Sequence, residues 1–147
     1  MKTKALKSSF IKCLCAALLA MVVPAYAGEN KADAEKAATT AAQTWLETID
    51  GGNYSKSWDG AAELFQKAVT KSGWEAALTG VRKPLGDLVA RKLKSAQAVK
   101  SLPGVPEGDY VVMQFETSFA NKKSAIETVT FSLEKDGRWK SAGYFIK

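Results

Sequence analysis

The sequence contains no histidine. This absence excludes histidine general bases, serine–histidine–aspartate triads and the usual zinc sites. The two cysteines, Cys13 and Cys15, both lie in the first 27 residues. A phosphate-binding glycine loop is also absent, because Gly51-Gly52 is not followed by Lys-Ser or Lys-Thr. We therefore expect neither a metal nor a cofactor.

Residues 1–27 combine the three parts of a secretory signal peptide. Four lysines accompany a short apolar run, Leu14–Val23, and Ala25-Tyr26-Ala27 forms a small-x-small cleavage site. We expect export to the periplasm or the medium, with cleavage after Ala27. The apolar run is too short to span a bilayer, so we expect membrane contact only during export. An uncleaved N-terminal anchor is the alternative.

Cleavage would change the bulk properties of the chain. It leaves 120 residues, the size of one domain with one core. Without the four lysines of residues 1–27, 17 basic and 15 acidic residues remain, a net charge of +2. Nucleic-acid-binding domains concentrate a basic excess on one face. A net charge of +2 is no such excess, so we expect no nucleic-acid partner. We expect residues 28–33 to form a flexible leader and residues 34–147 a single domain.

Helical periodicity dominates the first part of this domain. Apolar residues and alanines recur at helical spacing over residues 33–49, and a second pattern covers residues 54–69. Gly60 interrupts the second pattern and predicts two short helices. Ser72 begins a capping-box pattern, which predicts a further helix that ends before Pro84.

Beyond residue 86 the apolar period changes from helix to strand. The sequence predicts strands over residues 88–99, 110–119, 125–134 and 138–146. Their short connections favour an antiparallel meander. Helices followed by strands indicate an α+β fold, with N-terminal helices packed on a curved four-stranded antiparallel sheet.

Strand alternation places two charged side chains on the face that should carry the core. Arg91 alternates in step with Val89 and Leu93, and Glu127 alternates in step with Val129. A buried charge needs a partner, so the simplest hypothesis is an Arg91–Glu127 ion pair in the concavity of the sheet. Such a pair could fix strand register, line a small-molecule pocket, or supply Glu127 as a general acid or base.

Further candidates lie on the helices. Arg82 follows the helix that ends before Pro84 and should neutralise its C-terminal carbonyls; an anion contact at a cavity mouth is the alternative. Aromatic residues of the short helices can fill the core or line a cleft against the sheet. The candidate ligand-binding residues are Arg91, Glu127, Tyr54, Trp58, Trp74 and Arg82.

Several short motifs together resemble one bacterial family. They are Trp58, the Trp74 helix start, Arg82-Lys83-Pro84-Leu85-Gly86 with Arg91, the loop Leu102–Tyr110, Glu127-Thr128-Val129, and Asp136-Gly137-Arg138-Trp139 with Gly143-Tyr144-Phe145. Over residues 34–147 the pattern is similar to the domain-of-unknown-function 4019 family. The resemblance implies a small, exported protein and assigns no catalytic residue. The order of elements also resembles the NTF2-like and cystatin-like folds, which host several unrelated functions.

We therefore expect a non-enzymatic domain that binds a small molecule or a peptide in a cleft between the short helices and the sheet. The alternative is an envelope interaction or structural module that acts through a sheet edge or through residues 110–119. A third hypothesis is a cofactor-free lyase or isomerase that uses Glu127 with Tyr54 or Tyr144.

Overall fold

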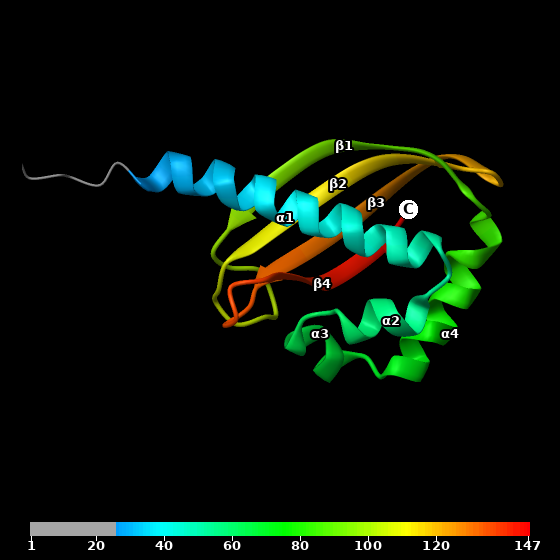
Figure 1. The fold of residues 1–147 in the computed structure, drawn as a ribbon, viewed down its shortest axis with the longest axis horizontal. Helices are drawn as coiled ribbons and strands as arrows, with labels where there is room; N and C mark the ends of the chain where they lie inside the picture. The colour runs from blue at the N-terminus through cyan, green and yellow to red at the C-terminus, as the bar shows by residue number, and fades with distance from the viewer. Residues whose placement is uncertain (1–25) are drawn as a thin grey trace, which may run out of the picture.

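The computed structural model describes residues 26–147, so the expected signal peptide lies outside the described residues except for its last two positions. The elements, shown in Figure 1, are α1 (Tyr26–Asp50), α2 (Tyr54–Asp59), α3 (Glu63–Ala68), α4 (Lys71–Val81), the short 3₁₀ turn η1 (Lys83–Leu85), β1 (Leu88–Val99), β2 (Tyr110–Phe119), β3 (Lys122–Leu133) and β4 (Trp139–Ile146). None of the helices in this part of the chain is both long and apolar enough to cross a membrane.

The four strands form one antiparallel sheet in the order β1-β2-β3-β4. Helix α1 crosses one face of this sheet, and α2, α3 and α4 gather beside β4 (Figure 1). The predicted α+β fold is confirmed. The break at Gly60 is also confirmed, because α2 ends at Asp59 and α3 begins at Glu63.

The core lies between α1 and the covered face of the sheet. Two alanines of α1, Ala38 and Ala42, have no exposed surface, which lets the sheet approach the helix closely. Alternate positions of the central strands supply the opposite side, because successive side chains of a strand point to opposite faces. The buried residues of these strands include Val111, Met113, Phe115, Val129 and Phe131.

Three elements start two residues or more away from the sequence-based expectation. Helix α1 begins at Tyr26 rather than Asp33, so the expected leader at residues 28–33 is helical; this stretch contains no proline and continues with helix-forming Ala, Glu and Lys. The N-cap of α4 is Thr70, whose Oγ1 accepts from the Gly73 N–H at 3.2 Å, and not Ser72. Strand β3 begins at Lys122 rather than Ala125, because a two-residue turn is enough to reverse the chain after β2.

The backbone edges of the sheet are partly occupied. Strand β2 lies between β1 and β3, so residues 110–119 offer no free edge to a partner. At the β4 edge, the Ala62 N–H donates to the Ser141 carbonyl at 2.8 Å. At the β1 edge, the Ala98 N–H donates to the Glu35 carboxylate at 2.9 Å. Such contacts protect edge strands from pairing with other chains.

Candidate functional site

The predicted ion pair between Arg91 and Glu127 is confirmed. Arg91 Nε lies 2.6 Å from Glu127 Oε2, and Nη2 lies 3.1 Å from Oε1. The other edge of the same guanidinium binds Asp50 at the end of α1, with Nη1–Oδ2 at 2.6 Å and Nη2–Oδ1 at 3.0 Å. Two bidentate contacts therefore fix the plane of the Arg91 side chain between a helix and a strand.

Three further side chains complete this cluster. Arg82 Nη2 donates to Asp50 Oδ1 at 3.0 Å, and its Nη1 donates to the Gly86 carbonyl at 2.7 Å. The hydroxyl of Thr117 donates to Glu127 Oε2 at 2.6 Å, and that of Tyr144 donates to Oε1. We call Asp50, Arg82, Arg91, Thr117, Glu127 and Tyr144 the charge network.

The electrostatics of the network are balanced, because it contains two cations and two anions. Burial tends to raise the pKa of Asp50, but the hydrogen bonds and charges of Arg91 and Arg82 outweigh it and hold that pKa below its usual value. Burial, together with the charge of Glu127, raises the pKa of Tyr144, so its phenol stays protonated as a donor. Burial tends to lower the pKa of Arg91, but its two carboxylate partners raise it overall.

Glu127 has no exposed surface and no unused hydrogen-bonding position that faces a cavity. Each of its oxygens accepts one bond from Arg91 and one from a hydroxyl group. A general acid or base must reach a proton of the substrate, and this carboxylate is sealed from solvent. The geometry therefore supports a structural role for the Arg91–Glu127 pair and gives no support to chemistry at Glu127.

Of the two interpretations of Arg82, helix capping is wrong, and sequence reasoning missed Asp50 as the partner of this side chain. The Arg82 side chain does not neutralise the last carbonyls of α4; it binds Asp50 and the carbonyl of Gly86, and its guanidinium carbon lies 4.3 Å from the ring centroid of Phe119. A signal for Asp50 was present in the sequence. A carboxylate at a helix C-terminus opposes the helix dipole, so it calls for a cationic partner.

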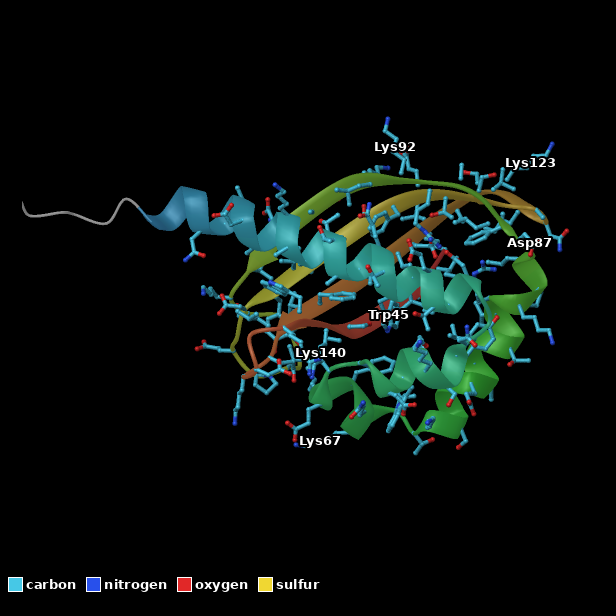
Figure 2. All side chains as sticks on the ribbon, viewed as in Figure 1. Trp45, Lys67, Asp87, Lys92, Lys123 and Lys140 are labelled. Carbon is cyan, nitrogen blue, oxygen red and sulfur yellow. The ribbon has the colours of Figure 1, made fainter. Side chains whose placement is uncertain are left out.

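The cleft expected between the short helices and the sheet is filled by aromatic side chains. Trp74 is 6 % exposed, stacks on Trp45 with ring centroids 6.2 Å apart, and donates its indole N–H to Ser57 Oγ at 2.9 Å. Figure 2 places Trp45 between α1 and these helices, whereas Lys67 and Lys92 point outward. Trp58 is half-buried and donates to the Val69 carbonyl at 2.7 Å. These aromatic residues belong to the core.

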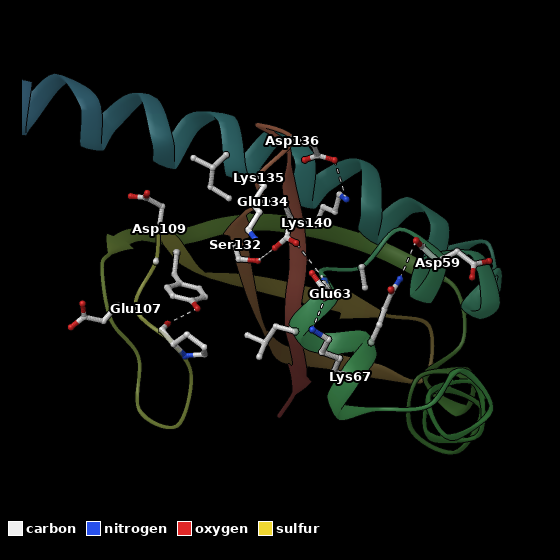
Figure 3. Close-up of a pocket in the computed structure, with 17 residues that line it drawn as sticks. Asp59, Glu63, Lys67, Glu107, Asp109, Ser132, Glu134, Lys135, Asp136 and Lys140 are labelled. Carbon is white, nitrogen blue, oxygen red and sulfur yellow. Dashed lines mark hydrogen bonds and ion pairs between the residues drawn. The ribbon is translucent and has the colours of Figure 1, made fainter.

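Two of the polar surface hollows contain charged residues of the loops or of the charge network. The larger, of ≈ 690 Å³, lies between α3, the β1–β2 loop and the β3–β4 turn, and we call it the charged groove (Figure 3). Most of its charged residues take part in ion pairs, as in Glu63–Lys67 and Asp136–Lys140. The second, of ≈ 450 Å³, brings Tyr54 together with Asp50 and Arg82 at the outer end of the charge network. Neither hollow includes Arg91 or Glu127 in its lining.

A third hollow lies between the N-terminal half of α1 and the sheet. This α1–sheet cavity has a volume of ≈ 310 Å³, and its surface is largely apolar. The nine lining residues are Asn30, Lys31, Ala34, Ala98, Val99, Lys100, Asp109, Tyr110 and Trp139. Small-molecule sites are concave and mainly apolar with a few polar groups, and this cavity fits that description.

Metal ligands do not gather in residues 26–147: no group of three or more Cys, Asp or Glu side chains there has the arrangement of an ion site. A search of curated proteins found no match. Residues 41–144 match the family described as protein of unknown function (DUF4019). This match spans the short helices, the charge network from Asp50 to Tyr144 and almost the whole sheet. The chain therefore belongs to the DUF4019 family, as its motifs predicted.

Proposed function

We propose that this protein is an exported, non-enzymatic binding domain that holds a small, largely apolar molecule in the α1–sheet cavity. The apolar cavity itself is the observation that carries the proposal. Its walls are the Ala34 side of α1, Ala98 of β1 and the aromatic rings of Tyr110 and Trp139. These residues come from both layers of the fold, so the site exists only in the folded protein.

Two features of the molecule agree with binding rather than catalysis. Glu127, the acid that was the catalytic candidate, is sealed inside the charge network. The cavity contains Asp109 as its only carboxylate, and Lys100 already pairs with it. A binding domain needs no reactive group, and a preformed apolar cavity is sufficient for affinity.

The decisive variant fills the cavity. Ala34→Leu adds three carbon atoms to a lining position of α1, whereas Ala37→Leu adds the same atoms at an exposed position of the same helix. We would titrate both variants and the unmodified protein with 1-octanol and with octanoate, following amide shifts by NMR. The proposal predicts that at least one probe binds, that Ala34→Leu weakens it at least tenfold, and that Ala37→Leu does not. Absence of binding by both probes would refute it.

Export is tested separately, by native mass spectrometry of the protein purified gently from the cell envelope. A mass that corresponds to a chain beginning at Gly28 would support cleavage after Ala27. A mass that still includes the N-terminal residues would indicate an anchored form instead. Additional mass on the folded species would also give the size of a natural ligand. We expect the processed form with such an adduct.

A further inference from the structure

Three polar side chains of the α1–sheet cavity have no hydrogen-bond or ion-pair partner among the described residues. Of the four tryptophans, Trp45, Trp58 and Trp74 each donate the indole N–H to an acceptor of the protein. Trp139, which lines the cavity, makes no such bond within residues 26–147. Lys31, at the other wall, forms no ion pair within the same residues. The amide of Asn30, with two N–H donors and one acceptor oxygen, forms no hydrogen bond there either.

The remaining polar groups of the cavity are already engaged. The Tyr110 hydroxyl donates to the Pro106 carbonyl at 2.7 Å, and the Ala98 N–H donates to Glu35. Asp109 is held by Lys100. The unused polar capacity therefore consists mainly of donors, and one of these donors carries a positive charge. A ligand matched to them offers acceptors and a negative charge.

We propose that the ligand of this cavity is an amphipathic carboxylate. Its apolar body lies against Ala34, Ala98 and the ring of Tyr110, and its carboxylate accepts from Trp139 Nε1 and pairs with the Lys31 ammonium group. At roughly 30 Å³ per non-hydrogen atom, the share of one water molecule in the liquid, the ≈ 310 Å³ cavity holds about ten such atoms. A straight-chain carboxylate of about eight carbons has this size.

This inference rests on the proposed function, and the experiment separates the two. Octanoate, 1-octanol and octylammonium share one apolar chain and differ in the head group. Each would be titrated into ¹⁵N-labelled protein, and the indole N–H signals would be assigned with Trp139→Phe. We expect octanoate to bind at least tenfold more tightly than 1-octanol. We also expect octanoate, but not 1-octanol, to shift the Trp139 indole signal strongly.

Lys31→Gln removes the charge at the mouth, and Lys36→Gln removes an equally exposed charge of α1 that does not line the cavity. Lys31→Gln should weaken the binding of octanoate threefold or more and leave the binding of 1-octanol unchanged. Lys36→Gln should change the affinity for neither probe. Equal binding of octanoate and 1-octanol, or tighter binding of octylammonium, would overturn the carboxylate assignment while the cavity remains a binding site. Failure of all three probes to bind would overturn both proposals.

Discussion

Removal of the Arg91 side chain tests the charge network most directly. Arg91→Met keeps an apolar stem but leaves Glu127, which has no exposed surface, without the cation that donates to both of its oxygens. Loss of one partner from a buried pair costs about 3–5 kcal/mol, because the remaining charge stays buried without compensation. Asp50 keeps its contact with Arg82, so we expect a loss near the lower limit, about 3 kcal/mol.

Urea unfolding at pH 7 measures this loss. With a slope of about 1.5 kcal/mol/M, a loss of about 3 kcal/mol lowers the midpoint by about 2 M. Lys94→Met is the matched control, because it breaks an ion pair of the same strand with Glu116, in which both side chains are at least half exposed. Exposed pairs contribute less than about 1 kcal/mol, so the midpoint of the control should fall by about 0.7 M at most.

A double variant isolates the buried charge as the cause. Arg91→Met with Glu127→Gln removes both charges, and the new amide can still accept from Tyr144 and donate to the oxygen of Thr117. We expect the double variant to be more stable than Arg91→Met alone by about 1 kcal/mol or more. The reasoning would be refuted if Arg91→Met cost no more than Lys94→Met, or if the losses at positions 91 and 127 were simply additive.

Three further predictions concern stability. Ser57→Ala removes the buried acceptor of the Trp74 indole N–H and should cost about 1–3 kcal/mol in urea unfolding; a loss below about 0.5 kcal/mol would contradict this. Gly86→Ala should destabilise the protein by about 1–2 kcal/mol, since Gly86 has φ = 77° and a Cβ there would lie 3.0 Å from Asn121 Nδ2; unchanged thermal unfolding would be the contrary result. The pKa of Asp50 is lower in the folded state. Its contribution to the free energy of unfolding is therefore present above its unfolded pKa, near 3.8, and is lost as the pH falls through the folded value. Below about pH 4 the free energy of unfolding of Asp50→Asn should depend less on pH than that of the unmodified protein, and parallel curves of this free energy against pH would exclude the prediction.

Local pattern was enough to predict the sheet and one ion pair. Strands β1 and β2 begin and end where the alternation of apolar residues placed them. The same alternation put Arg91 and Glu127 on the covered face, and the cost of burying an unpaired charge then required them to meet. Both inferences depend only on side-chain periodicity and on charge, which are properties that a single sequence displays.

The periodicity of the sequence does not predict how distant segments pack against one another. The expected aromatic cleft is closed because Trp45, Trp74 and Tyr144, from two helices and a strand, lie edge to face or stacked on one another. No local pattern reports which of several aromatic residues will meet. The α1–sheet cavity was not predicted, because the sequence pattern gave no helix over residues 26–32, which supply two of its lining residues.

The two ends of α1 are attached to the sheet unequally. Asp50 at its C-terminal end binds two arginines. In the part of α1 whose side chains are described, the other polar contacts with the sheet are those of Glu35 with the Ala98 N–H and of Thr39 with the Met113 sulfur. Local opening therefore requires less free energy at the N-terminal end, and amide hydrogen exchange should become faster from Asp50 towards Tyr26. A ligand of the α1–sheet cavity could then enter and leave through partial lifting of one helix end, with a residence time set by that motion while the core stays folded.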